Sequence, residues 1–187
     1  TGLSSIYPAL QKLGFKVTLD ARTSNLSGNF ENVTFNIPNP EVIESFETSI
    51  PFAQEINADL IISSDPDADR IGVMARHHDS YEFVNGNEIG IVLTNYVISK
   101  YKAKGTLNPN SVVIKTGVTT SLIEGIAQEN NIHCIGDLLV GFKYIGDEMN
   151  KLENDDRIQD FIIGAEESHG ILTGDYCRDK DAAGAAV

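Results

Sequence analysis

The 187-residue sequence contains no tryptophan, only two cysteines and few basic residues. No apolar stretch approaches the roughly 18 residues that a membrane-spanning helix needs, so we expect no transmembrane segment. The first 20 residues lack the basic start and apolar stretch of a secretory signal. Cys134 and Cys177 form no zinc-binding pattern, and so few cysteines favour a reducing, cytoplasmic compartment. Because the chain begins with Thr1 rather than Met, we expect a segment of a longer product.

Acidic side chains outnumber basic ones. Asp and Glu total 27 against 14 Lys and Arg, which gives a formal net charge of −13. Nucleic acids and anionic membranes bind basic surfaces, so we expect neither as a partner. A phosphorylated substrate is still compatible with the composition, because a few local cations or a metal can override the overall charge.

Helix-like and strand-like patterns alternate along the chain. The strongest helix pattern, residues 87–103, places Ile89, Val92, Leu93, Tyr96 and Val97 on one face. Other helices are predicted over residues 3–13, 121–129 and 142–152. A further helix is predicted to start at residues 39–41 (Asn-Pro-Glu) and to bury Val42, Ile43 and Phe46. Pro51 is expected to break or restart this helix. Strands are predicted over residues 15–19, 59–63, 71–75, 81–84, 112–115, 132–135 and 161–164. This alternation predicts an α/β fold of two consecutive α/β domains, with mixed, largely parallel sheets, flanking helices and a boundary near residue 83.

A carboxylate-rich loop, Asp-Pro-Asp-Ala-Asp-Arg at residues 65–70, directly follows an apolar strand pattern. Asp65, Asp67 and Asp69 occupy alternate positions and can converge if the loop curls around one point. Bringing these carboxylates together requires a neutralising cation, and hard carboxylate oxygens suit Mg²⁺ or Ca²⁺. Arg70 adds a guanidinium that can bind a phosphate through two of its oxygens.

This carboxylate-rich loop has two other interpretations. An EF-hand requires Gly at the sixth loop position and Glu at the twelfth, but counting from Asp65 these positions hold Arg70 and Arg76. The EF-hand is therefore excluded, and a solvated acidic turn is the alternative to a metal site.

A second polar loop, Glu-Glu-Ser-His-Gly at residues 166–170, also follows an apolar strand pattern. Glycines bracket the cluster, as in a strand-end loop that approaches a ligand. Glu166 and Ser168 can point the same way and hydrogen-bond adjacent sugar hydroxyls. A polar turn with a capping Glu is the alternative.

One lysine lies at the start of a predicted helix and another at the end of a predicted strand. Lys143 stands in the first turn after Gly141, where a cation is unfavourable unless an anion binds there. Lys115 ends a strand before Thr116 and is a similar case, with a solvated lysine as the alternative for both. We expect no functional role for His77, His78 and His133.

Together and in this order, these motifs resemble the α-D-phosphohexomutase family, which includes phosphoglucomutase and phosphomannomutase. Residues 65–70 resemble the family's metal loop, and residues 166–170 resemble its sugar-recognition loop. Four more segments fit the family's order and spacing: 38–41 (Pro-Asn-Pro-Glu), 85–88 (Asn-Gly-Asn-Glu), 140–143 (Val-Gly-Phe-Lys) and 178–181 (Arg-Asp-Lys-Asp). The resemblance assigns residues 1–83 to the family's second domain, truncated at its N-terminus. It assigns residues 84–187 to the third domain, truncated at its C-terminus.

The resemblance also implies a reaction. Family members interconvert hexose 1-phosphate and hexose 6-phosphate by Mg²⁺-dependent phosphoryl transfer, through an active-site phosphoserine and a hexose 1,6-bisphosphate intermediate. It implies glucose as the preferred hexose, and Mg²⁺ and glucose 1,6-bisphosphate as cofactors. The implied roles are Mg²⁺ ligation by Asp65, Asp67 and Asp69, phosphate or substrate contact by Arg70, sugar binding by Glu166 and Ser168, and phosphate contact or general acid–base catalysis by Lys143.

The family's phosphoserine loop and C-terminal phosphate-binding domain have no counterpart in these residues. We therefore expect this chain alone not to turn over substrate by the family's route, and we expect the remaining domains of the parent enzyme as partners. One alternative is a non-catalytic module that binds Mg²⁺ and sugar phosphate, and another is a purely structural acidic α/β domain.

Overall fold

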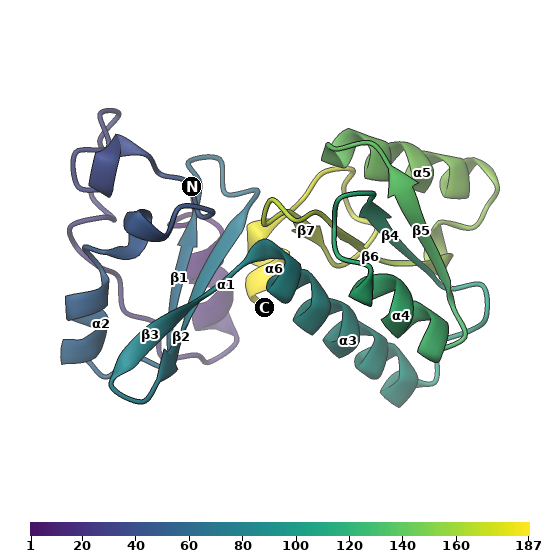
Figure 1. The fold of residues 1–187 in the computed structure, drawn as a ribbon, viewed down its shortest axis with the longest axis horizontal. Helices are drawn as coiled ribbons and strands as arrows, with labels where there is room; N and C mark the ends of the chain where they lie inside the picture. The colour runs from purple at the N-terminus through teal and green to yellow at the C-terminus, as the bar shows by residue number, and fades with distance from the viewer.

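The computed structural model describes all of residues 1–187, which fold around two separate β-sheets (Figure 1). The first sheet has the order β1-β2-β3 and is antiparallel throughout. The second has the order β5-β4-β6-β7, in which β4 runs parallel to β5 and β6 while β7 is antiparallel to β6. The strands are β1 (Leu60–Ser64), β2 (Ile71–His77), β3 (Ser80–Val84), β4 (Val112–Thr116), β5 (His133–Leu138), β6 (Phe161–Ala165) and β7 (Ile171–Leu172). The predicted α/β class with mixed sheets is confirmed. The prediction that the sheets are largely parallel is wrong, because the first sheet is built from the consecutive strands β1, β2 and β3 and is wholly antiparallel, so that only the β4–β5 and β4–β6 pairs are parallel.

Helices flank both sheets. The α-helices are α1 (Ile6–Lys12), α2 (Ile50–Glu55), α3 (Gly86–Lys104), α4 (Leu122–Glu129), α5 (Phe142–Asn154) and α6 (Ala182–Ala186). Short 3-10 turns are η1 (Thr34–Asn36), η2 (Ile43–Phe46) and η3 (Ile158–Asp160). None of these helices combines the length and the apolar character needed to span a bilayer.

The second sheet is covered on both faces, which explains its continuous apolar strands. Val113 of β4 packs in one cluster with Ile123 of α4, whereas its neighbours Val112 and Ile114 pack in another with Ile145 of α5. Alternate side chains of β4 therefore face opposite helix layers, as the two-residue period of a strand requires. The carboxyl ends of β4 and β6 are held at one edge of this sheet, where the polar loops begin.

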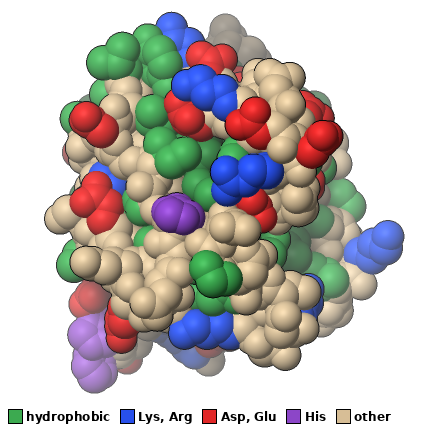
Figure 2. Space-filling model, turned by 90° about the vertical axis from the view of Figure 1, so that its right-hand side faces the viewer, with side chains coloured by type: hydrophobic (Ala, Val, Ile, Leu, Met, Phe, Trp, Pro, Cys, Tyr) green, Lys and Arg blue, Asp and Glu red, His purple; other side chains and the backbone are tan.

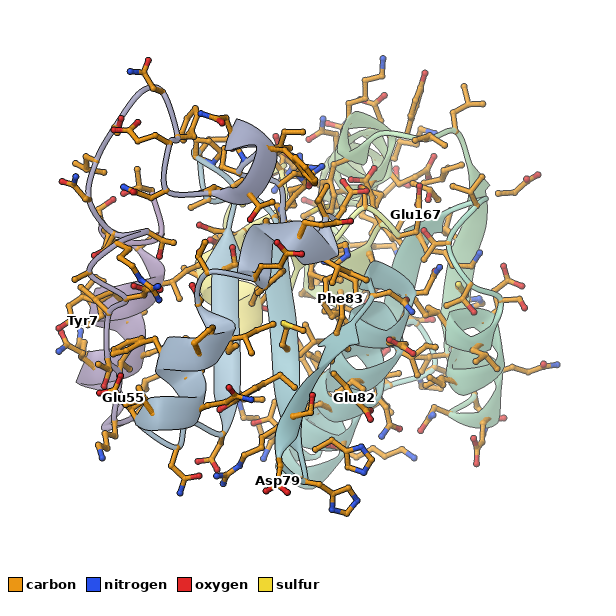
Figure 3. The ribbon with its side chains drawn as sticks, turned by 60° about the vertical axis from the view of Figure 1, so that its left-hand side comes forward. Tyr7, Glu55, Asp79, Glu82, Phe83 and Glu167 are labelled. Carbon is orange, nitrogen blue, oxygen red and sulfur yellow. The ribbon has the colours of Figure 1, made fainter.

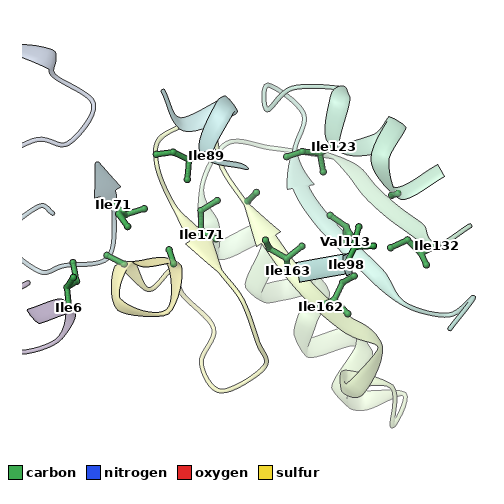
Figure 4. Packing of buried hydrophobic residues seen from close by; sticks show 14 of the residues in the cluster. Ile6, Ile71, Ile89, Ile98, Val113, Ile123, Ile132, Ile162, Ile163 and Ile171 are labelled. Atoms are coloured by element: carbon green, nitrogen blue, oxygen red, sulfur yellow. The ribbon is translucent and has the colours of Figure 1, made fainter. Parts of the chain in front are cut away.

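The C-terminal helix joins the two units. α6 contacts α1 and β2 of the first unit and β7 of the second. Its Ala182 shares one apolar core with Ile6, Ile71 and Ile171, and its backbone N–H donates to the carbonyl of Ala68 at 3.3 Å (Figure 4). The core thus runs from one sheet to the other and fixes the loops at their junction.

The predicted helix over residues 87–103 is confirmed as α3. Asn85 and Glu88 form a capping box at its start, and Gly105 in the left-handed conformation ends it. The predicted buried face is partly wrong, because Val92 and Tyr96 are 62% and 49% exposed. The buried face instead combines Ile89 and Ile98 with small residues, and Gly90 lies so close to α4 that an added Cβ would be 3.2 Å from the Cδ1 atom of Ile123.

Two predicted elements of the first unit are wrong. Residues 15–19 belong to no strand and form no β-ladder. The helix predicted from residue 39 is replaced by a turn, since the Asn39 side chain accepts the Glu41 N–H at 3.0 Å and competes with helix formation. Phe46 is buried as predicted but Ile43 is 51% exposed, and Pro51 does stand at the start of a new helix, α2.

Candidate functional site

The carboxylate loop between β1 and β2 curls because its first residue binds the backbone ahead of it. The Asp65 side chain accepts the N–H groups of Asp69 and Arg70 at 3.1 and 3.2 Å. Ala68 takes the left-handed conformation, with φ of 62°, and completes the turn. As a result, Asp65, Asp67 and Asp69 each present a carboxylate oxygen, and these atoms lie within 4.8 Å of one another.

The three carboxylates are not equally satisfied by the protein. One oxygen of Asp69, Oδ1, is buried without a hydrogen-bond partner, whereas Asp67 is exposed. Burial raises the pKa of Asp69; Lys180 opposes this and Asp65 adds to it, so the pKa lies above its usual value. A buried anionic oxygen without a donor is unfavourable, and a hard cation would satisfy it. The donor set therefore fits Mg²⁺ or Ca²⁺.

Arg70 is held at the base of this loop. Its Nε donates to Asp65 at 2.8 Å, and its Nη1 contacts Asn39 at 3.3 Å and Glu41 at 2.5 Å. Burial raises the pKa of Asp65, but the bonds from Arg70 outweigh burial and hold it below its usual value. Asn39 and Glu41 belong to the 38–41 segment, which fits the order and spacing of the family's motifs but to which sequence analysis assigned no role. Arg70 braces the carboxylate loop, and its contact with a phosphate remains a prediction.

Residues 166–170 form the loop between β6 and β7, called the recognition loop here after its expected role, and this loop closes on itself. The Glu166 N–H donates to the carbonyl of Gly170 at 2.8 Å, and the Ser168 hydroxyl lies 3.5 Å from a carboxylate oxygen of Glu166. The two side chains proposed to bind sugar hydroxyls are thus adjacent. Burial raises the pKa of Glu166 above its usual value, although the Lys180 ammonium opposes the shift.

The two loops are joined to each other by hydrogen bonds. Arg70 and Gly170 form an antiparallel bridge, and the Ile71 N–H donates to the carbonyl of His169 at 3.1 Å. The buried His169 ring makes a second bond, with Nδ1 2.9 Å from the carbonyl of Ile71, and its centre lies 5.6 Å from that of the Phe83 ring. Burial lowers the pKa of His169, which favours the neutral ring. Because the Ile71 carbonyl can only accept, Nδ1 is the donor in this contact. The candidate metal ligands and sugar ligands therefore face one junction.

Sequence analysis gave no role to Lys180, although it lies at the centre of this junction. Its Nζ is 2.7 Å from Asp69 and 3.2 Å from Asp179, and it lies 5.9 Å from the centre of the Phe142 ring. The side chain is 17% exposed, and its charge opposes the rise in the pKa of Glu166 that burial causes. The available signal was the 178–181 segment, which places a lysine between two aspartates.

The two lysines singled out from the sequence occupy different surroundings. Lys143 is exposed on the first turn of α5, with Nζ 4.9 Å from the centre of the Tyr144 ring. Its segment reaches the recognition loop through the backbone of Gly141, which lowers the pKa of Glu166. Lys115 is 2% exposed, which contradicts both a solvated position and direct contact with a bound anion.

Lysine and arginine side chains lie among carboxylates on the face shown in Figure 2, so the acidic net charge is offset locally.

Comparison with known proteins identifies the family. Residues 2–78 match the family model of phosphoglucomutase/phosphomannomutase alpha/beta/alpha domain II, and residues 85–187 match that of domain III. A phosphomannomutase of Mycoplasmoides pirum is 35% identical over 181 residues, which cover 95% of this chain and 31% of that protein. A phosphoglucomutase of Staphylococcus epidermidis is 40% identical over 145 residues, covering 77% of this chain and 25% of that protein.

Solved structures share the fold at lower sequence identity. A crystal structure from Thermus thermophilus, classed by name with the phosphomannomutases, aligns over 97% of this chain and 37% of its own, with a TM-score of 0.70 and 20% identity. A phosphoglucomutase/phosphomannomutase family protein from Burkholderia thailandensis aligns over 80% of this chain and 29% of its own, with a TM-score of 0.59 and 17% identity.

The chain belongs to the phosphoglucomutase/phosphomannomutase family. It spans between a quarter and a third of the length of the two curated relatives described above. The two matched ranges are separated by residues 79–84, which contain β3 and the predicted boundary near residue 83, and the limits 1–83 and 84–187 stay a prediction.

Proposed function

We propose that this chain forms the metal-binding and sugar-recognition part of a phosphohexomutase. That enzyme interconverts hexose 1-phosphate and hexose 6-phosphate, with glucose as the preferred hexose. The observation that carries the proposal is the junction of the two loops. Asp69, with its unsatisfied buried oxygen, lies one residue from the Arg70–Gly170 bridge that ties the carboxylate loop to the recognition loop.

Each group at the junction has a role that its surroundings support. Asp65, Asp67 and Asp69 would hold Mg²⁺, which when bound neutralises charge on a transferring phosphoryl group. Glu166 accepts and Ser168 exchanges hydrogen bonds with sugar hydroxyls, in a geometry set by the closed loop. We assign Arg70 and Lys143 to the phosphate, Lys143 as a contact or as a general acid or base.

The phosphoserine that donates the phosphoryl group lies, in this proposal, outside the chain. The remaining domains of the parent enzyme would supply it, and hexose 1,6-bisphosphate would be the intermediate that reorients between the two transfers. The short coverage of the relatives supports this division. The paucity of cysteine favours the cytoplasm as the location.

Phosphorus-31 NMR of the whole chain with glucose 1-phosphate, Mg²⁺ and a trace of glucose 1,6-bisphosphate tests the proposal. We expect Mg²⁺-dependent broadening of the glucose 1-phosphate signal and no glucose 6-phosphate. Asp67→Asn should abolish the Mg²⁺ dependence. Asp79→Asn is the matched control, because this exposed aspartate lies in the β2–β3 turn far from Glu167 (Figure 3).

The outcomes are separable. Formation of glucose 6-phosphate would show that a nucleophile lies within the chain and would overturn the division of labour proposed above. Absence of any Mg²⁺-dependent broadening would contradict a binding site formed by these loops. Broadening that survives Asp67→Asn would place the metal elsewhere.

A further inference from the structure

Lys115, at the carboxyl end of β4, is a buried cation that no step of the proposed function uses. Its side chain is 2% exposed, and four acceptors lie within 3.4 Å of its ammonium. The Nζ atom lies 3.0 Å from the carbonyl of Thr119, 3.3 Å from that of Thr116 and 3.4 Å from that of Gly136. A carboxylate oxygen of Glu124 completes the set at 2.8 Å.

Gly136 of β5 is packed closely against the Lys115 and Glu124 side chains. A Cβ on Gly136 would lie 3.0 Å from Cε of Lys115 and 2.7 Å from the Glu124 carboxylate. Glycine at this place in β5 therefore lets the lysine and the glutamate meet. Through the four acceptors, Lys115 ties together the end of β4, the β4–α4 turn, α4 and β5.

The β4–α4 turn is in turn bonded to the recognition loop. The hydroxyls of Thr116 and Thr119 lie 2.7 Å apart, and each is 3.0 Å from the same carboxylate oxygen of Glu167. The backbone N–H of Glu167 donates to the Thr119 hydroxyl at 3.1 Å. Thr119 thus binds Lys115 with its carbonyl and Glu167 with its hydroxyl. Glu167 is directly followed by Ser168 and preceded by Glu166, the two proposed sugar ligands.

A core role alone accounts poorly for a lysine at this position. Removing an ammonium from water is unfavourable, and apolar side chains of similar volume commonly give equal or greater stability than a buried ion pair. What a buried ammonium provides and an apolar side chain does not is a fixed orientation for several carbonyl groups at once.

We propose that Lys115 is a positioning residue, which sets the recognition loop through Thr119 and Glu167. The assignment of that loop to a sugar rests on the proposed function, whereas the mechanical link does not. Lys115 itself touches no ligand. Its loss loosens Glu167 and, with it, the alignment of Glu166 and Ser168.

Amide hydrogen exchange, followed by NMR on the whole ¹⁵N-labelled chain, tests the link. The quantity measured is the exchange rate of the Glu167 amide relative to that of Val113, which reports the stability of β4. We expect Lys115→Met to raise this ratio about tenfold, because losing one well-made hydrogen-bonded contact of roughly 1.4 kcal/mol changes an opening equilibrium by that factor. Lys151→Met is the matched control, since Lys151 is 67% exposed and pairs only with Glu148, and the ratio should stay unchanged.

An unchanged ratio in Lys115→Met would overturn the proposal. If that variant does not fold, Glu124→Gln takes its place, because it keeps the shape and removes the only charged partner of Lys115. In Glu124→Gln we expect a smaller rise of the same ratio, and no rise would equally overturn the proposal.

A second readout separates this proposal from the proposed function. In the folded variant that raises the exchange ratio, the dissociation constant for glucose 1-phosphate should rise about tenfold, while that for Mg²⁺ should stay unchanged. If no variant and no wild-type chain binds glucose 1-phosphate, the proposed function fails while the exchange result still decides the link. If binding persists unweakened in a variant with a loosened Glu167, Lys115 does not position the sugar ligands and the proposal fails.

Discussion

Ile71 and His169 are joined by two hydrogen bonds that run in opposite directions. The Ile71 N–H donates to the His169 carbonyl at 3.1 Å, and the His169 ring nitrogen Nδ1 donates to the Ile71 carbonyl at 2.9 Å. One residue follows the carboxylate loop and the other lies within the recognition loop. Because each bond ends on a backbone carbonyl of the opposite unit, the two loops are held to each other by the protein's own groups.

The recognition loop is also packed closely against the start of α3, and this contact should not tolerate a side chain. A Cβ on Gly86 would lie 1.9 Å from the carbonyl oxygen of Glu167 and 2.8 Å from the backbone nitrogen of His169. Since both are backbone atoms, the loop itself would have to move. We expect Gly86→Ala to lower the free energy of unfolding by about 1–3 kcal/mol, measured by urea denaturation.

A second helical glycine provides the control. Gly125 in α4 has no atom within 4 Å of an added Cβ. Gly125→Ala should therefore show only the gain in helix propensity and raise the free energy of unfolding by about 0.5–1 kcal/mol. Equal effects of the two substitutions would mean that the α3–loop contact does not constrain the fold.

Much of this architecture could be predicted because the signals are local. The alternation of Asp65, Asp67 and Asp69 after an apolar strand predicted a loop that brings carboxylates together, and the structure forms it with bonds inside the loop. The helix over residues 87–103 followed from its apolar period, and its capping groups are neighbours in sequence. Local patterns of this kind do not depend on distant partners.

The features that sequence analysis missed depend on distant partners. The apolar period of α3 could not indicate that Gly90 would meet Ile123 while Val92 stayed exposed. Residues 15–19 have a strand-like composition, but a strand also requires a neighbour to pair with. Lys180 reaches Asp69 only because the segment after β7 returns to the carboxylate loop, which no spacing in the sequence predicts.

Mg²⁺ should stabilise the chain if the carboxylate loop binds it. At an Mg²⁺ concentration about 100 times its dissociation constant, the free energy of unfolding should rise by about 2.7 kcal/mol. Asp67 is exposed, so Asp67→Asn should leave the metal-free stability within about 0.5 kcal/mol of the wild type while removing most of this gain. Thermal unfolding with Mg²⁺ and with EDTA measures both. A full gain in Asp67→Asn would exclude Asp67 as a ligand.

The buried His169 should make stability depend on pH in a defined direction. Burial lowers its pKa below the ordinary value of about 6.5, so the unfolded chain binds the proton more readily. The free energy of unfolding should therefore fall as the pH drops below about 6.5, until the pKa of the folded state is reached. His169→Gln keeps a donor for the Ile71 carbonyl and removes this dependence. Urea denaturation of the wild type and of His169→Gln at pH 7.5 and pH 5 measures how much the free energy of unfolding changes between the two pH values. An identical change in the two proteins would contradict the prediction.

The Lys180–Asp69 ion pair should matter most when no metal is bound. Lys180 is the cation nearest to the Asp69 carboxylate, with Nζ 2.7 Å from Oδ2, and it also opposes the rise in the pKa of Glu166 that burial causes. We expect Lys180→Met to lower the metal-free unfolding free energy by about 1.5–3 kcal/mol, the range for a hydrogen bond to a charged group. Saturating Mg²⁺ should recover part of this loss, because the metal supplies positive charge to the same carboxylates. Urea denaturation with and without Mg²⁺ measures the loss of unfolding free energy in each condition. The control is Lys151→Met, which removes the exposed ion pair of Lys151 with Glu148. This control should change the free energy of unfolding by less than about 0.5 kcal/mol in either condition. A loss in Lys180→Met that is the same with and without Mg²⁺ would show that Lys180 and the metal do not share Asp69.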